Sequence, residues 1–241
     1  MRKNILLLAL LTIVPTIAQE DTPQQWFMRA RVLQVDQGDV ADFEKAVAKK
    51  TKMFNSEEGD IILTYKVLTG NNAGVYERYL VSQKASSYDL DRSDELEYWA
   101  KNVAPYGDPV GGQQRWQLAE PLNIGEGAKK YMNKRIFVIK NGMDDHVYKY
   151  LWRQGKVVEK RNPDAVRRAF RLVSGGDTQI LAVFSLFDSY PWPENNSETS
   201  YQEDYDEMFG LKQEEMDYKN MMKSLRDWGG AQRYTLERVD F

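Results

Sequence analysis

The chain contains no cysteine and only one histidine among its 241 residues. Without cysteine it cannot form a disulfide, a thiolate zinc site, an iron–sulfur cluster or a cysteine nucleophile. With one histidine it cannot form a two-histidine zinc motif such as HExxH, and a Ser-His-Asp triad could use only His146. The sequence thus carries no catalytic signature. Whether the protein is an enzyme stays open at this point, with the balance against it.

Long apolar runs are also lacking, except near the start of the chain. Arg2 and Lys3 precede an apolar run from Ile5 to Val14, and the small residue Ala18 precedes polar sequence. This layout predicts a signal peptide over residues 1–18 and an exported, periplasmic or secreted, bacterial protein. The run is shorter than the roughly 20 residues of a membrane span. No later segment of the sequence has a longer apolar run, so we expect no membrane span in the mature chain. An uncleaved anchor is the alternative.

The sequence also lacks a block of basic residues. The chain has 33 basic and 36 acidic residues, and removal of the leader would take away two basic residues and no acid. A mildly acidic exported chain without a basic block is a poor candidate for nucleic-acid binding. With no cysteine to form disulfides, its stability must come from a hydrophobic core.

What the sequence does contain is an internal repeat. The segment GGQQRW at 111–116 resembles GGAQRY at 229–234, and the strand-like segment at 31–35 resembles that at 135–139. The copies lie 104 residues apart at the 31–35 match (135 − 31) and 118 residues apart at the 111–116 match (229 − 111), which indicates an insertion in the second half. The aromatic and proline-rich stretch at 188–197 fits this insertion, as a lid, a partner contact or a loop packed against the exterior.

Each half shows the element order β-α-β-β-α-β. In the first half, hydrophobic periodicity and turn residues predict strands at 26–35, 61–68, 74–82 and 112–118 and helices at 40–54 and 92–103. In the second half they predict strands at 134–140, 167–173, 179–187 and 230–238, a helix at 144–159 and a helical region at 200–227 that Gly210 divides. We expect the main stripe of this region to contain Leu211, Glu215, Tyr218, Met222 and Leu225.

The predicted fold class is α+β, with two tandem ferredoxin-like units. We place one unit at 24–118, a linker at 119–133 and the other unit at 134–241. In this order and repetition the chain resembles the dimeric α+β barrel superfamily, which includes antibiotic-biosynthesis monooxygenase-like and NIPSNAP-like domains. The resemblance implies one pseudo-dimeric α+β barrel with helices outside, in a monomer or a weak homo-oligomer.

Six side chains are the candidates for a ligand site inside this barrel: Arg29, Arg31, Glu77, Tyr79, Arg115 and Arg233. Arginine binds carboxylates through two parallel hydrogen bonds, so the predicted ligand is a small anionic or aromatic molecule. Alternatively, the arginines pair with Glu77 or with backbone carbonyls and simply fill the barrel. A register error of one residue would invert every assignment of a side chain to the interior.

We predict no metal site and no cofactor. His146 follows Asp144 and Asp145 at a helix start, where consecutive side chains diverge by about 100° and the acids favour the helix dipole. The acids at 89–95 alternate as in a calcium loop but lack its glycine and its final glutamate, so we read them as helix-capping acids.

The first functional hypothesis is a non-catalytic exported protein whose barrel binds a small molecule or serves as a scaffold. The resemblance implies a second, a cofactor-independent or haem-linked monooxygenase-like enzyme. The third is a cell-envelope protein-interaction module. A cavity with convergent polar groups and perturbed pKa values would favour ligand binding or catalysis, and a contiguous apolar surface patch would favour the module.

Overall fold

The computed structural model describes residues 24–56, 60–189, 198–226 and 231–240. The leader prediction, most of the 188–197 insertion and the second pair of repeat glycines lie outside the described residues. No helix in the described part of the chain combines the length and apolarity that crossing a membrane would require.

The element order is β-α-β-β-α-β in each half, as predicted, with a split last helix in the second half. The first half contains β1 (Phe27–Gln34), α1 (Val40–Phe54), β2 (Ile62–Val67), β3 (Tyr76–Gln83), η1 (Ala85–Tyr88), α2 (Ser93–Asn102), η2 (Ala104–Tyr106) and β4 (Asp108–Leu118). After η3 (Glu120–Leu122), the second half contains β5 (Tyr131–Val138), α3 (Asp144–Arg161), β6 (Val166–Ser174), β7 (Ile180–Phe187), α4 (Tyr201–Phe209), α5 (Gln213–Lys223) and β8 (Ala231–Arg238).

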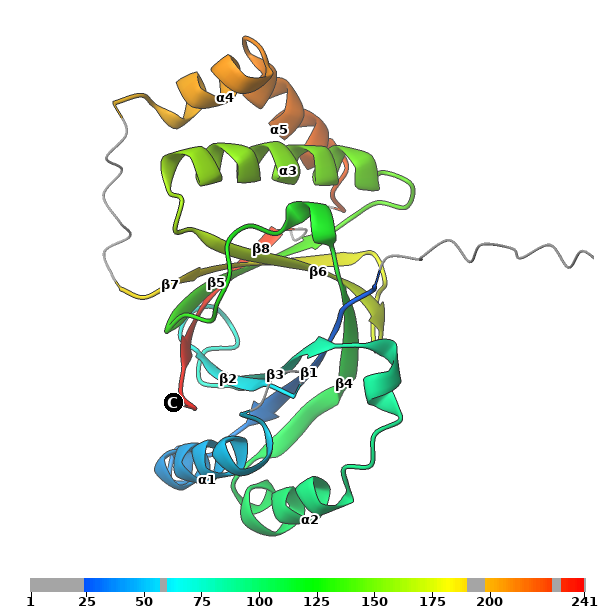
Figure 1. Ribbon diagram of the computed structural model, residues 1–241, viewed down its shortest axis with the longest axis vertical. Helices are drawn as coiled ribbons and strands as arrows, with labels where there is room; N and C mark the ends of the chain where they lie inside the picture. Colours follow the sequence, from blue (N-terminus) through cyan, green and yellow to red (C-terminus); the bar gives the residue numbers. More distant parts are fainter. Residues whose placement is uncertain (1–23, 57–59, 190–197, 227–230, 241) are drawn as a thin grey trace, which may run out of the picture.

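The eight strands close into one antiparallel barrel in the order β1-β3-β2-β8-β5-β7-β6-β4. Pairing of β2 with β8 and of β4 with β6 joins the two halves. Figure 1 shows the barrel between two helical layers, with α1 and α2 on one side and α3, α4 and α5 on the other. The predicted α+β class and the tandem ferredoxin-like barrel are therefore confirmed.

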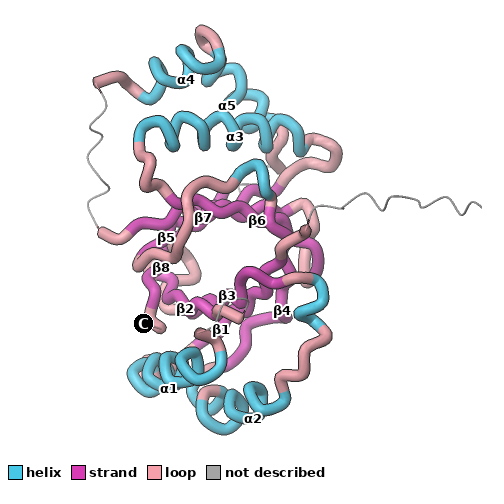
Figure 2. The backbone as a smooth tube through the Cα atoms, in the orientation of Figure 1, coloured by secondary structure: helices cyan, strands magenta, loops and turns pink. Residues whose placement is uncertain are grey.

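Alternation along the strands divides the side chains between two environments. One face of each strand contributes side chains to the cluster inside the barrel, while the other packs under the helices or meets solvent. Figure 2 shows the strands closed around this interior, with the helices outside them. In β1, Met28, Ala30 and Val32 lie in the interior cluster, whereas Leu33 packs against α1. The arginine-bearing face of β1 is therefore the outer one, whereas Arg29 and Arg31 were predicted to lie inside the barrel.

The last helical region differs from its prediction in the face that it buries. Gly210, with φ of 108°, ends α4 and separates it from α5. Leu211 is 80% exposed and Tyr218 is also exposed, whereas Met221 and Leu225 are buried under α3. The break at Gly210 resets the helical phase, so a stripe extrapolated from Leu211 through α5 was wrong at its start.

The other boundary differences are small. Strand β5 begins at Tyr131, inside the segment predicted as a linker, and β4 begins at Asp108 rather than 112. A capping box begins α4, because the Ser200 side chain accepts from the Glu203 backbone N–H and the Glu203 carboxylate accepts from the Ser200 N–H.

Candidate functional site

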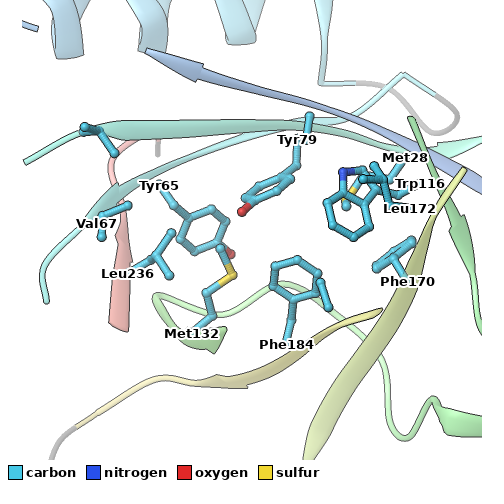
Figure 3. Packing of buried hydrophobic residues seen from close by; sticks show 13 residues of the cluster. Met28, Tyr65, Val67, Tyr79, Trp116, Met132, Phe170, Leu172, Phe184 and Leu236 are labelled. Carbon is cyan, nitrogen blue, oxygen red and sulfur yellow. The ribbon is translucent and has the colours of Figure 1, made fainter. Parts of the chain in front are cut away.

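The barrel interior is filled mainly by aromatic and aliphatic side chains. Figure 3 shows Tyr65, Tyr79, Trp116 and Phe184 directed toward one another from different strands. Ring centroids lie 5.6 Å apart for Tyr79 and Phe184 and 6.3 Å apart for Tyr65 and Tyr79, both edge-to-face. Such packing contributes to stability beyond the area that it buries.

Glu77, Tyr79 and Lys134 form a polar cluster inside this apolar wall. The Tyr79 hydroxyl and the Lys134 Nζ, at 2.6 Å, both donate to the same Glu77 carboxylate oxygen. Burial and the neighbouring carboxylate raise the pKa of Tyr79 well above its ordinary value. Glu77 and Tyr79 thus occupy the interior position predicted for them, with a lysine as their partner rather than an arginine. A ligand role for them stays a prediction.

The four predicted arginines do not face the interior, which corrects the sequence-based assignment. Arg29 and Arg115 stack from outside on Tyr88 of η1, with guanidinium carbons 4.3 and 4.2 Å from the ring centroid. Arg31 and Arg233 are exposed on the outer faces of β1 and β8. The interior of a small closed barrel is filled by side chains, and the strand faces with apolar residues meet that need at the lowest desolvation cost.

Arg29 and Arg31 instead line a cavity of about 150 Å³ between the outer sheet face and α2. We call it the α2 cleft. Its walls combine apolar side chains with charged ones: Arg29, Ala30, Arg31, Leu33, Lys50, Ile62, Arg78, Leu80, Arg92, Glu95, Leu96, Trp99 and Gln113. This volume is below that of typical drug-sized pockets, so it suits a small molecule or the end of a larger one.

The charges lining the α2 cleft do not balance. Five cations, from four arginines and one lysine, face the cleft together with one carboxylate, Glu95. Glu95 accepts from Lys50 and, at 2.6 Å, from Arg92, which also pairs with Asp60 beside the cleft. Burial opposes ionisation of Glu95, but these two cations still lower its pKa overall. Three carboxylates therefore serve five cations: Glu95 in the wall, Asp60 beside it, and Asp240, which acts on Arg78.

Lys50 is the most buried of these cations. It is 1% exposed, and its Nζ donates to Glu95 and to the Asn55 side-chain oxygen. Burial, and repulsion by Arg78, lower the pKa of Lys50 from 10.5 to about 8, against the opposing effect of Glu95.

Arg78 and Arg29 each hold donors that no described residue satisfies. The Arg78 guanidinium carbon lies 4.3 Å from the Trp99 ring centroid, and its Nε donates to the Thr64 hydroxyl at 3.2 Å. Its buried Nη2 has no hydrogen-bond partner in the described part of the chain, and the buried Nε atoms of Arg29 and Arg92 likewise have none there. Burial lowers the pKa of Arg78 to about 10, although Asp240 and Glu95 oppose the shift. Unsatisfied buried donors of this kind favour an anionic acceptor.

Lys50, Arg78, Arg92 and Trp99 were not among the predicted site residues, although two signals pointed to them. Lys50 follows Phe43 and Val47 at helical spacing, so a lysine falls within the apolar stripe of α1. Arg78 lies between Glu77 and Tyr79 and must face the opposite side of β3. No local pattern connects α1 to α2 across the sheet, so the convergence of the four residues required the fold.

The remaining sequence motifs do not form a site in the structure. His146 is exposed on the first turn of α3. Asp91 accepts from the Ser93 backbone N–H just before α2, whereas the N-cap residue itself is Arg92 and has no side-chain cap. Within the described ranges, no group of three or more His, Cys, Asp or Glu side chains could hold a metal ion.

Comparison with solved structures places this geometry among known folds. A provisionally assigned monooxygenase from Lactobacillus acidophilus superposes with a TM-score of 0.57 at 11% identity, covering 90% of this chain and 94% of that one. A second, from Fusobacterium nucleatum, gives a TM-score of 0.55 at 11% identity with the same coverage. A chlorite dismutase from Candidatus Nitrospira defluvii gives 0.50 at 10% identity, covering 91% and 94%.

These likenesses show the fold alone. At about one identical residue in ten, the α+β barrel is shared, while the chemistry of a site does not follow from it. No protein-family model matches the chain, and no curated protein matches its sequence.

Proposed function

We propose that this protein is an exported α+β barrel that binds a small anionic molecule, with a carboxylate group and a compact apolar body, in the α2 cleft. The observation that carries the proposal is the surplus of cations there: five line the cavity, and three of them hold buried donors without a partner among the described residues. An anion would satisfy those donors and reduce the mutual repulsion of the cations.

The cleft also favours a particular shape of ligand. Leu33, Ile62, Leu80 and Leu96 and the Trp99 ring provide apolar surface next to the guanidinium groups. Phosphate or sulfate would use only the charged part of the cleft. A small carboxylic acid would use both parts, because its head can accept from the arginines while its body covers the leucines.

Binding is tested by the thermal stability of the full chain with benzoate, with phosphate and with the neutral amide benzamide. We expect benzoate to stabilise the protein by about 2.7 kcal/mol at 100 times its Kd, and benzamide to have little effect. Arg78→Met should abolish the shift. Arg233→Met, an exposed arginine outside the cleft, makes the same change in net charge and should retain the shift. Equal shifts in both variants, or none in the wild type, would contradict the proposal.

The second candidate function is a monooxygenase-like enzyme. The solved neighbours described as monooxygenases support it by analogy of fold, and the Glu77–Tyr79–Lys134 cluster supplies ionisable groups in an apolar interior. In a haem-linked enzyme a histidine would serve as axial ligand of the iron. His146 is exposed on α3 rather than directed into a cavity, so it does not fit that role. Oxygen consumption with a panel of phenols tests this candidate, and Tyr79→Phe should lower any activity found.

The third candidate is an interaction module on the outer helical layer. Trp152, Met208, Leu211 and Met216 are exposed there, on α3, α4, the α4–α5 turn and α5. Exposed apolar side chains gathered in one layer are a feature of partner contacts. Analytical ultracentrifugation tests self-association through this layer, and a monomer at high concentration would contradict a homo-oligomer.

Mass spectrometry of the exported form tests cleavage after Ala18.

A further inference from the structure

We propose that Lys50 is a reactive amine in the α2 cleft and forms a reversible imine with ligands that carry a carbonyl group beside a carboxylate. This inference rests on the proposed anion binding and narrows the ligand class to small oxo acids.

The position of Lys50 is the first reason. Its side chain leaves the buried stripe of α1 and lines the same cavity wall as Arg78 and Arg92. A carboxylate held by the arginines would place the adjacent carbonyl group within the small remaining volume of about 150 Å³ that Lys50 also faces. Holding two reacting groups in one small cavity replaces an encounter in solution and favours reaction.

The surroundings of Lys50 are the second reason. Arg29, Arg31, Arg78 and Arg92 line the cavity with it, while Glu95 and Asp60 are the acids that act on it. Desolvation and nearby cations both favour the neutral amine, which is the nucleophilic form. The lowered pKa of about 8 agrees with this geometry, since an ordinary lysine would be almost fully protonated at neutral pH.

The buried lysine inside the barrel provides a contrast. Lys134 is paired with Glu77 at 2.6 Å and is surrounded by the aromatic rings of Tyr79 and Phe184. Of the two lysines, only Lys50 lines a cavity with a surplus of positive charge. We therefore expect the two to differ in reactivity because of their surroundings and not because of their burial.

The chemistry needs no oxidant or reductant. Lys50 first loses a proton to solvent, and the Nζ lone pair then attacks the carbonyl carbon to form a C–N bond. A proton moves from nitrogen to the former carbonyl oxygen and gives a carbinolamine. Loss of that oxygen as water breaks the C–O bond and leaves the imine, and hydrolysis reverses each step. The imine nitrogen takes up a proton from solvent, and Glu95, which already accepts from Nζ, is placed to pair with the resulting iminium ion.

The experiment is reductive trapping on the full chain. The protein is incubated with pyruvate and sodium cyanoborohydride, which reduces the imine to a stable secondary amine, and peptide mass spectrometry locates the adduct. We expect carboxyethylation of Lys50 at least tenfold above that of any other lysine, and suppression of the adduct by excess benzoate. Acetone, which lacks the carboxylate, should label Lys50 at least tenfold less than pyruvate.

Two variants test the chemistry, and binding is read separately from the benzoate thermal shift of the wild type. Lys50→Arg keeps the charge but cannot form an imine, so it should lose the adduct. Lys134→Arg is the matched control and should retain the Lys50 adduct. Because the wild-type adduct is mapped by its peptide, the result stands even if Lys50→Arg fails to fold.

The failures are distinguishable. A benzoate shift without selective labelling of Lys50 would overturn the imine and leave the proposed anion binding intact. Absence of both the benzoate shift and the labelling would overturn both the imine and the anion binding. Selective labelling of Lys50 that is equal for pyruvate and acetone would overturn recognition of the carboxylate.

Discussion

Replacing Arg78 with Met is expected to leave the free energy of unfolding nearly unchanged while it removes anion binding. A half-buried arginine under a helix is usually a structural anchor whose loss destabilises the fold. Arg78 differs because one of its buried donors lacks a partner in the described part of the chain and its positive neighbours repel it.

The magnitude follows from terms that oppose one another. The substitution loses the contact with Trp99, worth about 0.5–1 kcal/mol, and the hydrogen bond to Thr64, worth about 1.5–3 kcal/mol for a charged donor. It removes the unsatisfied Nη2, whose burial costs about 1–3 kcal/mol. It also relieves repulsion with Lys50 and Arg31, and the lost attraction to Asp240 and Glu95 opposes that gain. Met retains much of the apolar stem. The net change should stay within about 1.5 kcal/mol of the wild type.

The assay is urea unfolding followed by far-ultraviolet circular dichroism, since tryptophan fluorescence would report the altered contact with Trp99. The m value should not change, so any difference appears in the midpoint. Leu33→Ala is the reference variant for a large loss of stability. Leu33 is buried in the cluster between α1 and the sheet, so its truncation should lower the free energy of unfolding by about 2–5 kcal/mol.

A loss of more than about 3 kcal/mol in Arg78→Met would refute this reasoning. It would mean that internal partners satisfy Arg78 in the absence of ligand and that the guanidinium serves the fold. The surplus of cations would then give no reason to expect an anion.

Three further outcomes are expected. Gly155→Ala should destabilise the protein by about 1–3 kcal/mol despite its better helix propensity, because the new Cβ would lie 2.3 Å from the buried Arg167 guanidinium, and circular dichroism melts measure this. Leu236→Ala, inside the barrel, should cost about 2–5 kcal/mol in urea unfolding, and a cost below 1 kcal/mol would show that the interior can collapse around the gap. The pKa of Lys50 is lower in the folded chain, at about 8, than in the unfolded chain. Between pH 8 and pH 10.5 the unfolded chain therefore binds more protons at Lys50 than the folded chain does. The free energy of unfolding of the wild type, relative to that of Lys50→Met, should rise by about 1–2 kcal/mol from pH 8 to 9.5. A difference that does not change with pH would contradict the lowered pKa.

The fold could be predicted because its signals are local and repeated. Strand alternation around Met28 and Ala30 and the apolar stripe of α1 locate each element within a few residues, and repetition fixes the tandem arrangement. Closure into a barrel follows, because each sheet has an apolar face that helices do not cover. The phase of α5 after Gly210 was the weakest point, since a single break resets the helical register.

The candidate site could be predicted only in part. Two of the predicted arginines, Arg29 and Arg31, line the cleft. Their face of β1 could not be predicted, because it depends on which apolar face fills the barrel, and that is decided by packing. The partners in the cleft come from α1, β3 and α2, which lie far apart in sequence. Lys50 and Arg78 meet there only because the sheet brings α1 and β3 under α2.

The most direct test of anion binding in the α2 cleft is an NMR titration that follows the side-chain Nε–H resonances of arginine with benzoate. The buried Nε atoms of Arg29 and Arg92 have no hydrogen-bond partner among the described residues. Their Nε–H chemical shifts should therefore change in a saturable manner as benzoate is added, while that of Arg233 stays constant. Movement of all arginine signals together, or of none in the cleft, would contradict it.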